Sequence, residues 1–133
     1  MEILIKKLND QATLPAYDRE AGPGIDVNSL VEVTIMPGTS AVVSTGIAMA
    51  MPVGYVGLIW NQKGTVIGED IKATAGMVDS GYREEILVEL TNTGAEEKKI
   101  APGERVAQIL VQKIEHANLI EAEDLSSFDP ETE

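Results

Sequence analysis

Short apolar runs separated by glycine and proline turns occupy most of this chain. The runs cover residues 2–8, 31–35, 40–51, 55–60, 85–90 and 105–114. Turn signals such as Pro37-Gly38, Pro52-Val53-Gly54 and Pro102-Gly103 stand between them. Many short strands joined by such turns are typical of a sandwich or a barrel. The pattern therefore predicts an all-β fold in a single domain.

Two of the runs carry more specific information. In "VEVTI" (31–35) apolar and polar positions alternate, which predicts a strand with Val31, Val33 and Ile35 on one side. The periodicity of "RVAQILVQKI" (105–114) fits either a short buried helix or a strand. Its valine and isoleucine content favours the strand.

Composition and charge narrow the class of partner. The chain has 133 residues, 44% of them hydrophobic, and a net charge of -12 from 10 basic and 22 acidic residues. Duplex nucleic acid needs clustered cations, so a nucleic-acid polymer is not expected as a partner, whereas a small phosphorylated ligand remains possible. No apolar run approaches the ~20 residues of a membrane span, so no membrane is expected. The absence of cysteine favours a cytoplasmic location.

The acidic C-terminal region is expected to lie outside the folded core. Residues 115–133 contain seven acidic side chains and no lysine or arginine. We expect a single β domain over residues 1–120 and a tail over 121–133 that is flexible or exchanged between subunits.

Carboxylates are the candidates for acid–base chemistry. His116 is the only histidine, so a histidine-based triad or multi-histidine metal site is excluded, and His116 itself is expected at the surface. Asp26 and Asp79 both lie in glycine-rich segments beside predicted strands, where a ligand can approach the backbone closely. The alternative is that each aspartate only caps its own turn.

Four ordered segments together resemble the trimeric dUTPase family over nearly the full chain. "PGIDV" (23–27) matches the first family motif at Gly24 and Asp26, and residues 33–57 match the following run from a Pro-Gly turn to a Thr-Gly-Ile strand. "GMVDSGYREE" (76–85) matches the third motif, with Glu84 in place of its final glycine. "GERVAQ" (103–108) matches the fourth motif.

The resemblance implies a β jelly-roll or distorted β-barrel that forms a homotrimer and hydrolyses dUTP to dUMP and pyrophosphate with Mg²⁺. Asp79 would match the carboxylate that deprotonates the attacking water. Tyr82 would match the aromatic ring that packs on the deoxyribose and excludes a 2′-hydroxyl. Asp26 would match the acid that holds hydrated Mg²⁺. The matches to the base-reading hairpin and the phosphate-supporting residues would be Thr74, Ala75, Gly76, Val78, Arg105 and Gln108.

Two departures from the family motifs leave a second hypothesis open. Gln62-Lys63-Gly64 stands where the family has Arg-Ser-Gly, so Lys63 either binds phosphate as a point charge or points to solvent. The glycine-rich closing arm of the family is absent, and Phe128 is the only possible remnant of its stacking ring. The alternative is a catalytically weak or inactive protein that binds a nucleotide or a protein partner.

A weaker resemblance links the same region to the dCTP deaminases, which share the fold. Thr74, Ala75, Asp79, Gly81 and Glu89 match their pattern. Glu89 would then correspond to the deaminase base. The preferred interpretation is that Glu89 is an outward-facing residue of the alternating strand "EILVEL".

Overall fold

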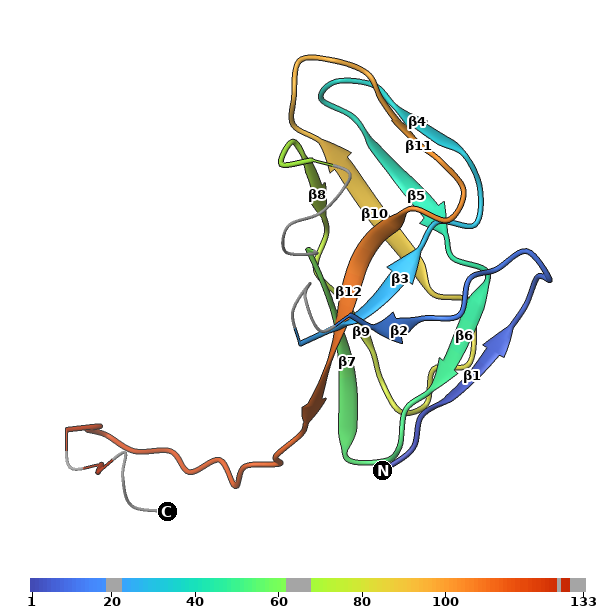
Figure 1. Ribbon diagram of the computed structural model, residues 1–133. Helices are drawn as coiled ribbons and strands as arrows, with labels where there is room; N and C mark the ends of the chain where they lie inside the picture. The colour runs from blue at the N-terminus through green and yellow to red at the C-terminus, as the bar shows by residue number, and fades with distance from the viewer. Residues whose placement is uncertain (19–22, 62–67, 127, 130–133) are drawn as a thin grey trace.

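The alternating runs fold as short antiparallel strands (Figure 1). The computed structural model describes residues 1–18, 23–61, 68–126 and 128–129. The strands are β1 (Leu4–Lys7), β2 (Ala16–Tyr17), β3 (Ile25–Asn28), β4 (Val33–Ile35), β5 (Ser40–Ser44), β6 (Ile47–Ala50), β7 (Tyr55–Trp60), β8 (Ile71–Ala73), β9 (Gly76–Val78), β10 (Leu87–Asn92), β11 (Lys98–Ile100) and β12 (Arg105–Lys113). No helix occurs among the described residues, including any that could span a membrane, and the predicted all-β class is confirmed.

The strands form a five-stranded sheet in the order β2-β3-β12-β7-β9 and a three-stranded sheet in the order β5-β10-β8. Two further pairs, β1 with β6 and β11 with β4, extend the structure at its margins. Strands far apart in sequence lie side by side, because β12 is hydrogen-bonded between β3 and β7. This jelly-roll topology brings the segments around residues 26, 60 and 108 to neighbouring positions in one sheet.

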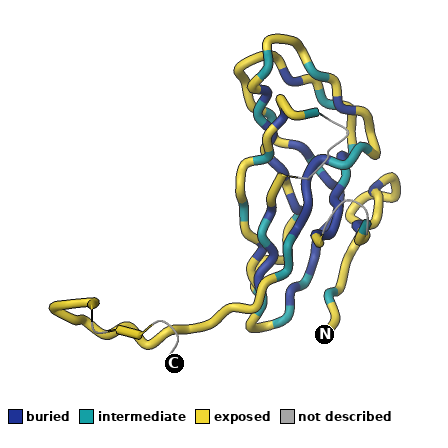
Figure 2. Tube along the Cα trace, turned by 60° about the vertical axis from the view of Figure 1, so that its left-hand side comes forward, coloured by how far each residue is buried: buried dark blue, intermediate teal, exposed yellow. Residues whose placement is uncertain are grey.

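The core lies between the inner faces of these sheets (Figure 2). Val27, Ile109 and Val78 contribute from the five-stranded sheet, and Val88 and Leu90 from the three-stranded sheet, each at most 2% exposed. The inward residues of β3 and β12 are apolar, whereas alternate residues on the outer face are polar. The same alternation that builds the core therefore presents a row of polar side chains on the other face.

Two of the predicted runs behave differently in the structure. Residues 40–51 divide into β5 and β6, because Gly46 adopts a left-handed φ of 71° and the chain leaves one sheet for another. In "VEVTI" only Val33–Ile35 is a strand, and Val31 is 46% exposed in the preceding turn. The expectation that Val31 shares the buried side is therefore wrong. The segment 105–114 forms a strand, as its composition favoured.

Beyond β12 the chain leaves the body of the molecule and extends along a separate path (Figures 1 and 2). Residues 114–126 contain no strand. His116 is exposed, as expected, and Leu119, Leu125 and Phe128 are 90%, 79% and 70% exposed. This part of the tail buries almost none of its apolar surface within one subunit.

Candidate active site

Asp79 begins a tight turn that directly follows β9. The Gly81 N–H donates to Asp79 Oδ1 at 2.9 Å, and the Tyr82 N–H donates to the Asp79 carbonyl oxygen at 3.2 Å. Asp79 therefore caps its own turn, as the simpler sequence alternative proposed. The capping bond uses one carboxylate oxygen, and Oδ2 has no hydrogen-bond partner among the described residues. The side chain is exposed, so it can act on a ligand while its position is held by the turn.

Tyr82 lies at the end of this turn, over a shallow apolar cavity. Its hydroxyl donates to the Glu85 carbonyl oxygen at 2.6 Å, and its side chain is 36% exposed. The cavity has a volume of about 230 Å³. The residues lining it are Ile59, Gly76, Met77, Val78, Tyr82, Ile86 and Leu87. A small, flat, apolar group fits such a hollow.

The turn is anchored to the β5–β6 connection by Glu85. Glu85 Oε2 accepts hydrogen bonds from Ser44 Oγ and from the Gly46 N–H, the latter at 2.8 Å. The next residue continues the anchor, since the Ile86 N–H donates to Ile47 O at 2.9 Å and Thr45 Oγ1 donates to Ile86 O at 2.6 Å. Sequence reasoning missed Glu85. Its partners lie about 40 positions earlier in the chain, and no local pattern reveals them.

Thr74 and Ala75 connect two different sheets. β8 pairs with β10 and β9 pairs with β7, so residues 74–75 form a crossover between sheets and the expected hairpin is wrong. The Thr74 hydroxyl donates to Glu89 Oε1 at 2.8 Å, and its N–H donates to Glu89 O at 2.9 Å. Glu89 is exposed, which confirms the outward-facing interpretation. Thr74, Ala75 and Asp79 lie along one exposed edge, with Gly76 half-buried and Val78 pointing into the core.

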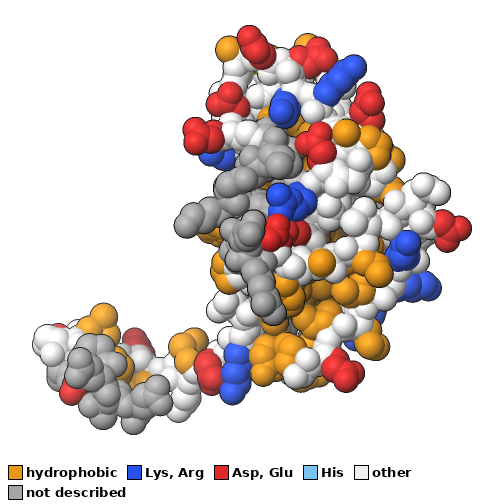
Figure 3. Space-filling view, viewed as in Figure 1, with side chains coloured by type: hydrophobic (Ala, Val, Ile, Leu, Met, Phe, Trp, Pro, Cys, Tyr) orange, Lys and Arg blue, Asp and Glu red, His pale blue; other side chains and the backbone are white. Residues whose placement is uncertain are grey.

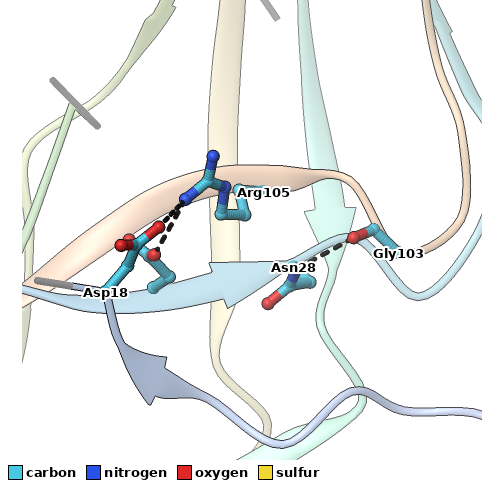
Figure 4. A network of polar contacts seen from close by, with 5 residues as sticks. Asp18, Asn28, Gly103 and Arg105 are labelled. Atoms are coloured by element: carbon cyan, nitrogen blue, oxygen red, sulfur yellow. Dashed lines mark hydrogen bonds and ion pairs between the residues drawn. The ribbon is translucent and has the colours of Figure 1, made fainter. Parts of the chain in front are cut away.

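A second group of polar side chains lies on the outer face of β3 and β12. Asp26 is inside β3 and only 7% exposed, so the expectation that it sits in a turn is wrong. The Arg105 guanidinium donates through Nη1 to Asp18 at 2.6 Å, as Figure 4 shows, and to Asp26 at 3.4 Å. Asp18 carried no signal in the sequence beyond being one acid among many.

A β-bulge brings Arg105 and Gln108 to the same face. Residues three apart in a regular strand point to opposite sides. Here Arg105 pairs with Asn28 and Ala107 with Val27, so the register shifts between them. Gln108 then lies opposite Asp26. Bulges of this kind re-aim side chains, and this one gathers the guanidinium, the carboxylate and the amide on one side of the sheet.

The turn before the bulge is fixed to β3. Asn28 Nδ2 donates to the Gly103 carbonyl oxygen at 2.9 Å (Figure 4). The Ser29 and Gly103 backbones add two further bonds, Ser29 N–H to Glu104 O and Gly103 N–H to Ser29 O, each at 2.8 Å. Gly103 has a φ of 88°, a left-handed conformation that favours glycine. These contacts fix the start of β12, and with it the position of Arg105.

Gln108 is held in a confined place. Its side chain donates through Nε2 to Asn61 O at 2.8 Å, and the residue is 6% exposed. Its Oε1 is buried without a hydrogen-bond partner among the described residues. A Cβ on Gly24 would lie 2.4 Å from this oxygen, so only glycine leaves room for it. An unpaired buried acceptor is costly in an isolated protein and indicates a place where a further donor or a hydrated ion belongs.

The oxygen donors of this second group fit magnesium held through water. Asp26 and Gln108 Oε1 supply hard oxygen ligands side by side, which Mg²⁺ prefers. In the described part of the chain no three acidic or histidine side chains gather as a metal cage. Magnesium commonly keeps several waters and binds through one or two carboxylates together with substrate phosphates, so this sparse donor set suits it.

The two groups lie well apart within one subunit. Val78 pairs with Gly57, and Gln108 pairs with Trp60. Asp79 is thus displaced from Gln108 by four residues along β7 and by two strand spacings, which together place the two about 16 Å apart. The segment predicted to complete the phosphate contacts, Gln62, Lys63 and Gly64, lies outside the described residues.

Fold and site define an all-β jelly-roll protein with two sets of exposed or ligand-ready polar side chains on one sheet. A family model described as dUTPase matches residues 10–132. The deoxyuridine 5′-triphosphate nucleotidohydrolase of Nautilia profundicola is 38% identical over 128 residues, covering 95% of this chain and 90% of that protein. The protein of the same name from Corynebacterium diphtheriae is 40% identical over 127 residues, covering 93% and 84%. The chain belongs to the dUTPase family.

Solved structures agree on the fold. The dUTPase of Staphylococcus bacteriophage 80alpha with dUpNHpp superposes with a TM-score of 0.84 at 22% identity, covering 97% of this chain and 92% of that chain. The dUTPase of phage phi11 of S. aureus, whose structure reveals the coordination of a structural Mg(II) ion, also has a TM-score of 0.84, at 21% identity, covering 96% and 100%. The jelly-roll expected from the sequence is therefore confirmed.

Proposed function

We propose that this chain hydrolyses dUTP to dUMP and pyrophosphate. The observation that carries the proposal is the Asp79–Tyr82 turn. It presents an exposed carboxylate, held by the Gly81 N–H, beside an aromatic ring that is tethered through its hydroxyl. A water molecule positioned by Asp79 Oδ2 loses its proton to this carboxylate as its oxygen attacks the α-phosphorus. The bond from that phosphorus to the bridging oxygen breaks, and pyrophosphate leaves.

Substrate selection would follow from the same turn. The Tyr82 ring lines the apolar hollow, and its hydroxyl is occupied by Glu85 O, so the ring presents a fixed wall to a sugar. A deoxyribose fits against such a wall, whereas a 2′-hydroxyl would be pressed against it without a hydrogen-bond partner. The exposed backbone at Thr74, Ala75 and Gly76 is available to read the edge of uracil.

The second group would hold the phosphates and the metal ion. Asp26 would bind hydrated Mg²⁺ through water, and Arg105, Gln108 and the unplaced Gln62, Lys63 and Gly64 would support the phosphates. When bound, Mg²⁺ neutralises the triphosphate charge that builds up during transfer. The chain's own contribution is a buried carboxylate and an amide oxygen at adjacent positions of paired strands.

A homotrimer with shared sites would reconcile the separation of the two groups. Asp79 and Gln108 of one chain are too far apart to act on one phosphate, and a second copy can supply the missing partner. Hydrophobic side chains gather on the face over β1, β2 and β6 (Figure 3). A cavity of about 240 Å³ there is lined by side chains that include Ile5, Tyr17 and Met49. A patch of this kind suits a subunit contact.

The proposed domain organisation keeps residues 1–120 as the β domain and 121–133 as a tail. Exposed apolar side chains such as Leu119 and Leu125 support exchange of the tail between subunits, because they have no cover within one chain. A cytoplasmic location is proposed on the absence of cysteine from the sequence.

Pyrophosphate release from dUTP with Mg²⁺, measured beside Asp79→Asn, tests the function. Turnover by the natural chain that is lost in the variant supports it. Calorimetric binding of dUTP without any turnover would instead favour the binding-protein alternative. Ammonia release from dCTP would favour the deaminase. A monomer by light scattering would contradict the shared-site architecture.

A further inference from the structure

Asp18 reaches the phosphate side of the sheet through strand pairing. Ala16 of β2 pairs with Asp26 of β3, so the two residues share a face. Asp18 follows two positions after Ala16 and therefore points to the same side. Its carboxylate meets the Arg105 guanidinium, which the bulge in β12 directs to this face. Three charged side chains from three neighbouring strands thus converge.

Arg105 is shared unequally by two carboxylates. Its Nη1 lies 2.6 Å from Asp18 Oδ2 and 3.4 Å from Asp26 Oδ2. The Asp26 side chain is 9% exposed, against 39% for Asp18 and 30% for Arg105. The shorter contact is therefore made to the more exposed acid, and the buried acid receives only the longer one.

The charge balance of this trio bears on cation binding. Asp26 with Arg105 alone would be close to neutral, and a guanidinium beside a carboxylate competes with a metal ion for it. Asp18 adds a second negative charge, so the trio carries a net charge of about -1 when both acids are ionised. An unbalanced positive charge at Arg105 would repel a divalent cation held near Asp26.

We propose that Asp18 is a positioning residue for the magnesium-bound nucleotide. It holds Arg105 and offsets its charge, so that the Asp26 carboxylate keeps its attraction for hydrated Mg²⁺. Asp18 itself touches neither the metal ion nor the substrate. The inference rests on the proposed function, since it concerns the metal that the dUTP reaction uses.

A simple stabilising ion pair is the alternative explanation. Exposed pairs of this kind contribute little to folding, so losing Asp18 would then shift the melting temperature slightly and leave metal dependence unchanged. The two explanations therefore differ in how nucleotide binding responds to the Mg²⁺ concentration.

The test measures binding, which does not require turnover. The full chain is titrated with the non-hydrolysable analogue dUpNHpp by calorimetry over a series of Mg²⁺ concentrations. The readout is the Mg²⁺ concentration at which the gain in affinity is half complete. The variants are Asp18→Asn, which removes the charge, and Asp18→Glu, which keeps it. Asp10→Asn removes an identical charge from an exposed loop residue outside the trio and serves as the matched control.

Asp18→Asn is expected to raise that Mg²⁺ concentration about two- to fivefold, the size typical of a part-exposed ion pair. Asp18→Glu and Asp10→Asn are expected to behave like the natural chain. Equal values for Asp18→Asn and Asp10→Asn overturn the inference, and so does analogue binding by the natural chain that does not depend on Mg²⁺. If the natural chain binds the analogue with Mg²⁺ but releases no pyrophosphate from dUTP, the proposed function fails and the inference is still decided by the binding series.

Discussion

Tyr82 donates its hydroxyl hydrogen to the main-chain oxygen of Glu85 at 2.6 Å, and the Glu85 side chain in turn binds the Gly46 N–H at 2.8 Å. The aromatic ring is therefore fixed to the β5–β6 connection through a single intervening residue. This relationship joins the specificity of the proposed site to the core, because Gly46 is where the chain passes between sheets.

Removing the tether of Tyr82 should weaken discrimination against ribonucleotides. In Tyr82→Phe the ring remains but its hydrogen bond is lost, a change of about 0.5–1.5 kcal/mol. We expect the ratio of kcat/KM for dUTP over UTP to fall, with little change in thermal stability. Tyr55→Phe is the control, since the Tyr55 hydroxyl makes no hydrogen bond with the described residues. An unchanged ratio would show that the tether does not set selectivity.

Asp79→Asn should remove the proton acceptor and keep the turn. Asparagine retains an Oδ1 that accepts the Gly81 N–H, so the fold is preserved. We expect kcat for dUTP to fall about 10²–10⁴-fold, the usual contribution of a general base. KM and the melting temperature should stay close to those of the natural chain. A variant that keeps more than a tenth of the activity, on the order set by that range, would exclude Asp79 as the base.

Glu85→Ala should loosen the turn from behind. It removes the acceptor of the Ser44 hydroxyl and the Gly46 N–H, both part-buried contacts. We expect a loss of about 1–3 kcal/mol in the free energy of unfolding, measured by urea denaturation, together with a higher KM for dUTP. The neighbouring Glu84→Ala is the matched control, because Glu84 is exposed and makes no hydrogen bond with the described residues. Equal losses in the two variants would contradict the anchoring role.

Gly24→Ala should displace Gln108. The added Cβ would lie 2.4 Å from Gln108 Oε1 and 2.8 Å from its Cβ, so the amide must move away from Asn61 O. We expect a destabilisation of about 1–3 kcal/mol and weaker binding of the dUTP analogue. Truncating the partner in Gly24→Ala with Gln108→Ala should restore part of the stability lost through overpacking. Simple additivity of the two single changes would show that the two residues do not clash.

Much of the strand pattern could be predicted because it is written locally. The run 55–60 coincides with β7, and β-branched residues identified β12 as a strand. The division of residues 40–51 at Gly46 could not be seen, because one glycine inside an apolar run fits either a continuous strand or a break. Val31 was misplaced for a related reason, since the alternation continues past the point where pairing with β11 ends.

The candidate site was only partly readable from the sequence. Asp79 and Tyr82 are three positions apart, and the structure keeps them in one turn. Arg105 and Gln108 share a face only because pairing with β3 creates a bulge, a tertiary event without a local signal. Asp18 and Glu85 act through partners distant in sequence, and such partners cannot be identified from one chain.

The bulge at Arg105 also limits how this lineage can change. Deleting one residue there would restore the regular alternation and turn the guanidinium toward the space now filled by Val106 and Ala107, which are 2% and 0% exposed. Length variation is thus tolerable in the extended tail but prohibitive at this point, where a single codon lost would exchange interior for exterior along the strand. Family members are expected to differ in length at the turns and the tail, while the count between Gly103 and Gln108 stays constant.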